Sequence, residues 1–190
     1  MAKSAKRVCW DACAWIALIQ DEEIRDEKTG QLIENRGAMC RAVIELAKKG
    51  KIEIVTSALS LAEVCKNRNI KDDDPSKIAA FFEHEFVLLS NLDRTVGERA
   101  RVLMMSGLSG LKPADACHLA TAAVAPNVSE LHTFDGDLLN LDLKIEKADK
   151  AMLRICRPDA SVGVEPPLLG AMRRGQGSTT TEPQGEEESG

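Results

Sequence analysis

Aromatic residues are scarce in this sequence of 190 residues: they make up 3% of it, with 2 Trp, 4 Phe and no Tyr. Stacking platforms for the bases of single-stranded nucleic acid are therefore not expected. The chain also lacks an excess of positive charge, because its formal net charge at pH 7 is −5. That balance argues against a nucleic-acid binder that works through a basic surface. It does not exclude an enzyme whose carboxylates bind a metal ion, because a bound cation reverses the local charge.

Metal-binding cysteine patterns and long apolar runs are also lacking. The six cysteines contain no CxxC pair and no Cys/His zinc spacing, so we interpret them as small apolar residues in a reducing compartment. The N-terminus has no apolar segment of signal-peptide length, and no run approaches the roughly 18 apolar residues of a membrane span. We therefore expect a soluble cytoplasmic protein that does not bind membranes.

The composition predicts one folded domain followed by an extension. Hydrophobic residues make up 44% of the chain, enough for a sizeable core, and no internal repeat is visible. From about Pro158 the composition changes, and the end of the chain is dominated by Gly, Ser, Thr, Glu and Gln. We predict a domain over residues 1–157 and a largely disordered C-terminal extension over residues 158–190.

Short apolar strands alternate with helices along the predicted domain. The strands are predicted at Arg7–Trp10, Ile52–Val55, Phe86–Leu89 and Leu131–Phe134, with a last weak strand near Leu143–Ile145. Helices are predicted over 12–19, after Asn35, and over 57–67, 76–82, 93–105 and from Pro113, whereas the charged stretch 21–34 is interpreted as a loop. This alternation predicts an α/β fold with a parallel sheet and helices on both of its faces.

One of these helices begins with a carboxylate in its first turn. Pro113 suits the first helical position, where its missing N–H is no loss, and Asp115 follows where the helix dipole favours an anion. The residues after Asp115 are mostly small and apolar, which predicts a helix buried against the sheet. Taken alone, Asp115 is interpreted as a first-turn stabiliser.

Three further carboxylates are predicted at the edge of the sheet where parallel strands end and ligands bind. They are Asp11 after the first strand, Glu63 early in the helix after the second, and Asp135 after a later strand. Each has a structural alternative. Asp11 could cap the next helix, and Asp135 could belong to a turn. Glu63 could complete a capping box with Ser60.

The coincidence of all four acids at one edge favours a metal site. Carboxylates gathered there repel one another unless a cation neutralises them. Oxygen ligands without a His or Cys partner fit Mg²⁺ or Mn²⁺ rather than zinc. Such an ion can activate water for attack on a phosphodiester.

Four motifs of this chain, in this order, resemble those of PIN-domain ribonucleases, including VapC-type toxins of toxin–antitoxin pairs. They are Trp10–Cys13, Thr56–Val64, Pro113–Ala122 and Thr133–Leu138, and the resemblance covers roughly residues 7–147. It implies a three-layer α/β/α sandwich with a central parallel sheet. It also implies a Mg²⁺- or Mn²⁺-dependent endoribonuclease, a homodimer and, for a toxin, an antitoxin protein that blocks the site.

The resemblance also implies roles for single residues. The acids that match the metal-binding and catalytic positions are Asp11, Glu63, Asp115 and Asp135, with Asp137 as an auxiliary ligand. The family often has Ser or Thr shortly after its first Asp, whereas this chain has Ala12 and Cys13. A hydroxyl from Thr133 could take that place, although a threonine in a strand is as often there for packing.

Two other functions are compatible with the sequence. A catalytically weak PIN-fold interaction module would use the acidic edge to bind a basic segment of a partner. A phosphatase with Asp11 as nucleophile is less favoured, because Cys13 stands where a second Asp would be expected.

No substrate-binding residue is identified: His118 is interpreted as a packed, hydrogen-bonded histidine. Four basic residues are interpreted as belonging to a solvated helix face rather than to a phosphate site, namely Arg94, Arg99, Arg101 and Lys112.

Overall fold

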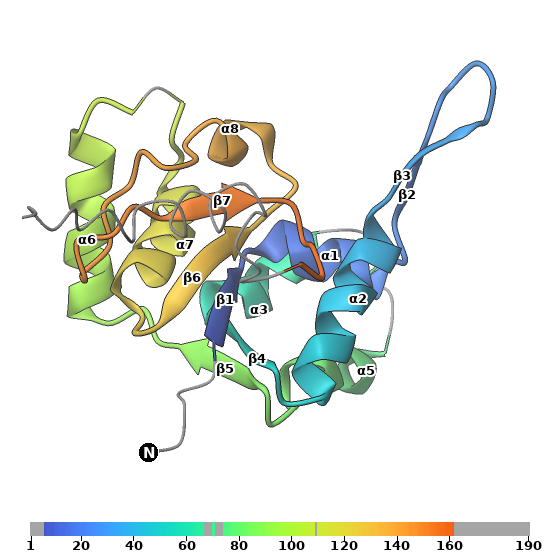
Figure 1. Ribbon diagram of the computed structural model, residues 1–190, viewed down its shortest axis with the longest axis horizontal. Helices are drawn as coiled ribbons and strands as arrows, with labels where there is room; N and C mark the ends of the chain where they lie inside the picture. The colour runs from blue at the N-terminus through green and yellow to red at the C-terminus, as the bar shows by residue number, and fades with distance from the viewer. Residues whose placement is uncertain (1–5, 67–69, 71–73, 109, 162–190) are drawn as a thin grey trace, which may run out of the picture. The chain divides into compact units, whose positions relative to one another are not determined.

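A computed structural model describes residues 6–66, 70, 74–108 and 110–161 (Figure 1). Internal contacts divide the chain into residues 1–160 and residues 161–190. Of the second unit only Ser161 is described, so the predicted C-terminal extension lies almost entirely outside the described residues and stays a prediction.

A parallel five-stranded sheet lies at the centre of the first unit. Its strands are β1 (Lys6–Trp10), β4 (Ile52–Ser57), β5 (Val87–Ser90), β6 (Val128–His132) and β7 (Arg154–Cys156), in the order β5-β4-β1-β6-β7. The register places Trp10, the last residue of the central strand, opposite Thr56 and His132 of its two neighbours. The segments that follow these three strands therefore leave the sheet at the same edge.

Helices cover both faces of the sheet, which confirms the three-layer α/β/α prediction. They are α1 (Ala12–Ile19), α2 (Arg36–Lys48), α3 (Leu59–Glu63), the 3₁₀ turn η1 (Val64–Lys66), α5 (Pro75–Phe82), α6 (Arg94–Met105), α7 (Pro113–Val124) and α8 (Gly136–Leu139). Figure 1 shows α6 and α7 on one side of the sheet and α1, α2 and α5 on the other.

Each face of the sheet has its own core. On the α7 side, the small residues of the helix let its backbone approach the strands, and Ala116 and Ala120 pack in one cluster with Leu131. On the other side, the ring of Trp10 lies 4.8 Å from that of Trp15, centroid to centroid. Buried side chains thus hold two of the helices on which candidate acids lie, α1 after Asp11 and α7 with Asp115 in its first turn.

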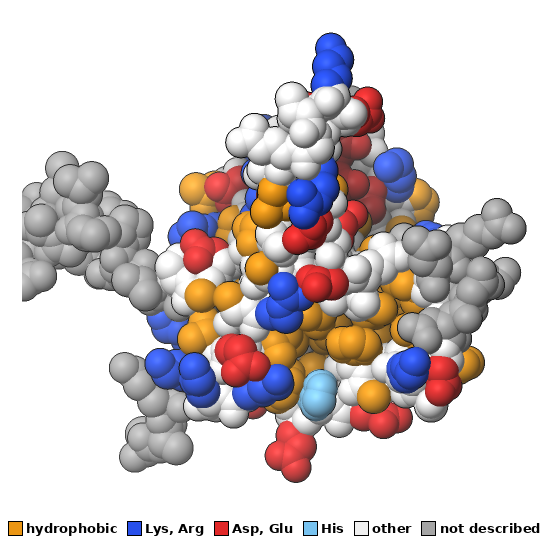
Figure 2. All heavy atoms as spheres, turned by 90° about the vertical axis from the view of Figure 1, so that its right-hand side faces the viewer, with side chains coloured by type: hydrophobic (Ala, Val, Ile, Leu, Met, Phe, Trp, Pro, Cys, Tyr) orange, Lys and Arg blue, Asp and Glu red, His pale blue; other side chains and the backbone are white. Residues whose placement is uncertain are grey.

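Three predicted segments differ from the structure. The stretch interpreted as a loop contains an antiparallel ribbon of β2 (Glu23–Arg25) and β3 (Leu32–Asn35), which projects at the top of Figure 2 with charged side chains. It has no buried apolar face, so its sequence has no strand-like hydrophobic pattern. The last strand is β7, so the strand predicted near Leu143–Ile145 is wrong. Those residues come just before an isolated bridge between Glu146 and Met152, and β7 follows that bridge. The helix predicted over 57–67 is shorter, and Asn67 lies outside the described residues.

The cysteines are all free. Cys9 and Cys40 are buried, but Cys65 is exposed, so not every cysteine belongs to the core. Among the described residues, no helix has both the length and the apolar character needed to cross a membrane.

Candidate active site

The four predicted acids stand at one edge of the sheet, each on a different connection. Asp11 follows β1 and caps α1, and Asp135 follows β6 and caps α8. Glu63 is the last residue of α3, in the segment after β4, and Asp115 lies in the first turn of α7. Because these connections leave neighbouring strands at the same end, the chain brings together residues that are up to 124 positions apart in the sequence.

The charges of all four acids act on one thiol. The pKa of Cys13 is raised first by burial and then by four negative charges, those of Asp11, Asp135, Asp115 and Glu63. Cys13, two residues after Asp11 and partly buried, thus lies at the same edge of the sheet as the acids.

Two of the acids have a raised pKa in the folded protein. Burial raises the pKa of Asp11, which is 2% exposed, and the charge of Asp135 adds to the rise. Burial and then the charge of Asp135 also raise the pKa of Asp115, whereas the charge and backbone of Lys112 oppose that rise. This corner of the protein thus has negative charge that its own residues do not fully compensate.

Asp11 is held by hydrogen bonds to both carboxylate oxygens. Its Oδ1 accepts from the backbone N–H of Ala14 at 3.0 Å, which is the helix cap considered from the sequence. Its Oδ2 accepts from the hydroxyl of Thr133 at 2.5 Å. The capping alternative for Asp11 is therefore correct, and it coexists with the placement of Asp11 among the acids.

Asp135 is fixed in a similar way at the start of α8. Its Oδ1 accepts from the backbone N–H groups of Asp137 at 2.8 Å and Leu138 at 3.1 Å. Its own backbone N–H donates to Thr133 Oγ1 at 2.9 Å. Asp137 is exposed, and its described contact with the site is this backbone donation.

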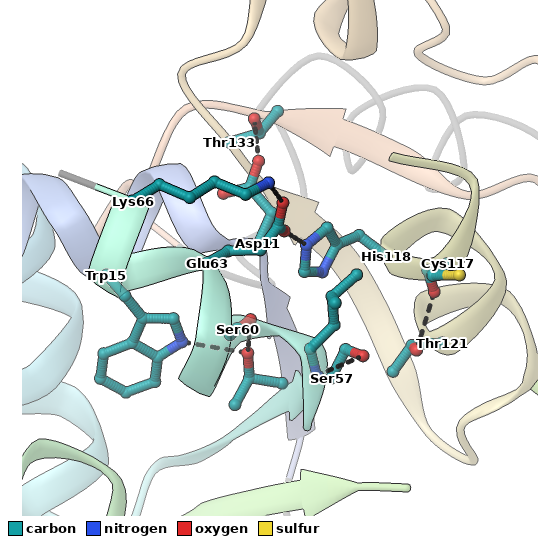
Figure 3. Close-up of polar contacts among 12 residues, drawn as sticks. Asp11, Trp15, Ser57, Ser60, Glu63, Lys66, Cys117, His118, Thr121 and Thr133 are labelled. Carbon is teal, nitrogen blue, oxygen red and sulfur yellow. Dashed lines mark hydrogen bonds and ion pairs between the residues drawn. The ribbon is translucent and has the colours of Figure 1, made fainter. Parts of the chain in front are cut away.

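Glu63 does not form the capping box that the sequence allowed. Helix α3 begins at Leu59, so Ser60 lies inside it, and the Ser60 hydroxyl is 2.9 Å from Thr56 Oγ1. The carboxylate of Glu63 instead contacts two cationic or donor side chains, His118 and Lys66 (Figure 3). The hydrogen bond to His118 is the largest of the influences that lower the Glu63 pKa to about 2, so the side chain is ionised.

Sequence reasoning missed the role of Lys66 and underestimated that of His118. Lys66 lies three residues after Glu63, a spacing that favours an ion pair on a helix, and that signal was available. His118 is buried and hydrogen-bonded as expected, but its partner is Glu63, 55 positions away, which spacing cannot reveal. Arg99 donates to the backbone carbonyl of Glu146, and Arg101 donates to Glu98, both on exposed surface, in agreement with a solvated helix face.

A second group of candidate ligands lies on β6 and β7. Among the described residues, the one set of three His, Cys, Asp or Glu side chains with ligand atoms within 4.8 Å of one another is Glu130, His132 and Cys156. The sequence search for zinc spacing missed it because strand pairing, not spacing, brings Cys156 to the other two. The four acids at the sheet edge, all of them among the described residues, do not form such a set.

Comparisons with known proteins bear on the same part of the chain. The family model described as PIN domain matches residues 8–144. No curated protein matches the sequence. Among solved structures, the Mycobacterium tuberculosis toxin VapC20, described as cleaving the sarcin–ricin loop, is 18% identical in sequence with a TM-score of 0.49. That match covers 68% of this chain and 91% of the VapC20 chain.

Proposed function

The chain belongs to the PIN domain family, and on this premise we propose that it is a metal-dependent endoribonuclease that hydrolyses RNA phosphodiester bonds. The observation that carries the proposal is the position of four acids, from four connections, at one edge of the parallel sheet. Acids gathered without a catalytic or binding purpose would cost stability, because each raises the energy of the others' charges.

The donor set fits a hard divalent cation. All four candidate ligands are carboxylates, and the raised pKa values of Asp11 and Asp115 indicate charge that a cation would neutralise. Carboxylate oxygens suit Mg²⁺ or Mn²⁺, and Mg²⁺ typically keeps several waters and uses few protein ligands. When bound, such an ion supplies an activated water and stabilises negative charge on the phosphate.

The protein's own residues supply orientation and charge. Asp11 has both oxygens directed by hydrogen bonds, so its carboxylate is pre-oriented. Glu63, Asp115 and Asp135 complete the proposed ligand and catalytic set, and we keep Asp137 as an auxiliary ligand. RNA is the proposed substrate class, and a bound cation is what allows its phosphates to approach this acidic edge. We place the activity in the cytoplasm.

The proposal is tested by cleavage of structured and unstructured RNAs in Mg²⁺ and in Mn²⁺. Asp11→Asn and Asp115→Asn keep the shape of each side chain but remove its charge, and both variants should lose cleavage. Glu98→Gln is the matched control, because it removes an acid that pairs with Arg101 on the exposed face of α6. EDTA should silence the wild type. Undiminished cleavage in both Asp variants, or cleavage that survives EDTA, would contradict the assignment.

One contact favours a second candidate, an interaction module. The amino group of Lys66 already pairs with Glu63, so the acidic edge accepts a cationic side chain. A basic segment of a partner, such as an antitoxin, would bind there by the same chemistry. Wild-type protein that binds Mn²⁺ but cleaves none of the RNAs would favour this module over the enzyme.

We also propose a homodimer. Helix α6 exposes three large apolar side chains, Val102, Met104 and Met105, the last with 73% of its surface accessible. Light scattering should give a dimer mass for the wild type and a monomer mass for Met105→Asp. A monomeric wild type would contradict the proposal.

A further inference from the structure

The two carboxylate oxygens of Glu63 have partners of very different mobility. Oε2 lies 2.6 Å from Nε2 of His118, whose side chain is 3% exposed. Oε1 forms an ion pair with Nζ of Lys66, whose side chain is 70% exposed. Figure 3 shows the two partners approaching Glu63 from different elements, His118 from α7 and Lys66 from the turn after α3.

The His118 contact is a fixed one. A carboxylate can only accept, so Nε2 of His118 carries the proton and donates it to Glu63. Among the described residues, Nδ1 of His118 has no hydrogen-bond partner, so within that part of the chain the ring is hydrogen-bonded through Nε2 to Glu63. Helix α7 is packed against the sheet on both sides of this residue, by Ala116 and Leu119 among others. The ring is therefore enclosed on a packed helix and has less freedom to move than the exposed Lys66 side chain.

The Lys66 contact is a replaceable one. Its ammonium group sits on a long side chain that is 70% exposed, so water can solvate the ammonium when it leaves the less exposed carboxylate. An ammonium and a divalent cation compete for the same oxygen, and the doubly charged ion interacts more strongly at a given distance. Lys66 can thus leave Oε1 at small cost, whereas His118 stays on Oε2.

We propose that Lys66 is a resident counter-ion of Glu63 that a divalent cation displaces from Oε1, and that His118 is the positioning residue that holds Glu63 during this exchange. The inference rests on the proposed function, because it requires a cation at the acidic edge. Each oxygen of Glu63 would then have a separate role, with Oε2 held by His118 and Oε1 free to bind the cation.

The Lys66 half of the proposal is tested by calorimetric titration of metal-free full-length protein with Mn²⁺. Lys66→Met removes the competing charge and should bind Mn²⁺ about two- to fivefold more tightly than the wild type. Lys66→Arg keeps the charge and should resemble the wild type. Lys112→Met is the matched control, because the charge of Lys112 acts on Asp115 without an ion pair to Glu63. A gain for Lys66→Met no larger than that for Lys112→Met would overturn the counter-ion role.

The His118 half uses the same titration with two polar variants of similar size. His118→Gln places an amide N–H about where Nε2 lies, whereas the shorter His118→Asn does not reach Glu63. Loss of an outer partner of a metal ligand typically weakens metal binding 10- to 100-fold, roughly, and the Asn variant should show a loss of this size. The Gln variant should recover most of the affinity. Equal affinities for the Gln and Asn variants would overturn the positioning role.

The outcome for the wild type separates this inference from the proposed function. If the wild type binds Mn²⁺ and neither set of variants behaves as stated, only the roles of Lys66 and His118 are wrong. If the wild type binds no Mn²⁺ at all, the metal-dependent function is itself contradicted and the inference fails with it.

Discussion

The hydroxyl of Thr133 donates to Oδ2 of Asp11 over 2.5 Å, across 122 positions of sequence. The oxygen of that hydroxyl also accepts the backbone N–H of Asp135 at 2.9 Å. One buried hydroxyl therefore links two of the four acids and sets the orientation of the carboxylate that follows the central strand. Thr133 directly follows β6, so this hydroxyl reaches Asp11 from a neighbouring strand rather than from α1.

Thr133→Val should damage both the fold and the site. Valine has nearly the same shape but leaves Asp11 Oδ2 and the Asp135 N–H without this partner, at a cost of about 1–3 kcal/mol in the free energy of unfolding. Mn²⁺ affinity should fall about 10- to 100-fold, because Asp11 is no longer oriented. Urea unfolding and calorimetry measure the two effects. Thr133→Ser keeps the hydroxyl and should stay near the wild type; equal Mn²⁺ affinities for the Val and Ser variants would contradict this role.

Asp11→Asn should stabilise the metal-free protein at neutral pH. The pKa of Asp11 is raised above its ordinary value of 3.8, mainly by burial. Between 3.8 and the folded-state pKa, the native state binds more protons than the unfolded state, so the free energy of unfolding falls as pH rises through that window. Asparagine avoids this loss and can still cap α1 through its oxygen.

The measurement is urea unfolding in EDTA at a series of pH values from about 4 to 8. The difference between Asp11→Asn and the wild type should grow with pH and reach about 1 kcal/mol in favour of the variant. The pKa of Glu63 is lowered from an ordinary 4.5 to about 2, so Glu63 makes the free energy of unfolding rise with pH between these values. This contribution is the same in Asp11→Asn and in the wild type, so it cancels in the difference between them. A variant less stable than the wild type at neutral pH would show that the Asp11 charge is compensated in the fold.

The sequence was sufficient to place the four acids because their positions depend on topology. Strands that alternate with helices run parallel, so a residue just after one strand lies near residues just after its neighbours. Asp11 and Asp135 are of this kind. Asp115 was placed by the dipole and proline signals at the start of its helix. These arguments need only the order of elements, not their exact bounds.

What the sequence could not give depends on contacts between distant side chains. The capping box of Glu63 failed because the helix begins one residue before Ser60, which no local signal fixes. Strand β7 is only three residues long and has one fully buried side chain, Ile155, so it has no periodicity to recognise. The β2–β3 ribbon pairs polar and charged residues, with Asn35 of β3 donating to Glu23 of β2 at 3.0 Å, and hydrophobic patterning does not detect it.

Thr56→Val should weaken the fold while having less effect on the metal site than Thr133→Val. The fully buried Thr56 hydroxyl donates to the carbonyl of Trp10 at 2.8 Å and accepts from the indole N–H of Trp15 at 3.0 Å. Valine would leave both groups unpaired, at a cost of about 2–3 kcal/mol in the free energy of unfolding. None of the four acids hydrogen-bonds to Thr56, so Mn²⁺ affinity of the folded variant should stay within about twofold of the wild type. A larger loss of affinity than in Thr133→Val would contradict this separation.

The group formed by Glu130, His132 and Cys156 should not bind zinc, although its ligand atoms are close enough. The indole N–H of Trp10 can only donate a hydrogen bond. It donates to Nδ1 of His132, with 3.2 Å between the two nitrogens. Nδ1 therefore carries no proton. The ring proton is on Nε2, which donates to Oε2 of Glu130 at 3.1 Å. Burial raises the pKa of Cys156 to about 12, so its sulfur is a thiol that donates to Glu130.

Zinc would need the lone pair of Nε2 and the thiolate of Cys156. The proton of His132 would then move to Nδ1, where it would face the N–H of Trp10. In long-range ¹H–¹⁵N spectra, His132 should show a protonated Nε2 both before and after one equivalent of Zn²⁺ is added. Cys156→Ser should leave the zinc affinity of the whole protein unchanged. A shift of the His132 signals together with weaker zinc binding in Cys156→Ser would show instead that the Trp10 hydrogen bond gives way to a metal.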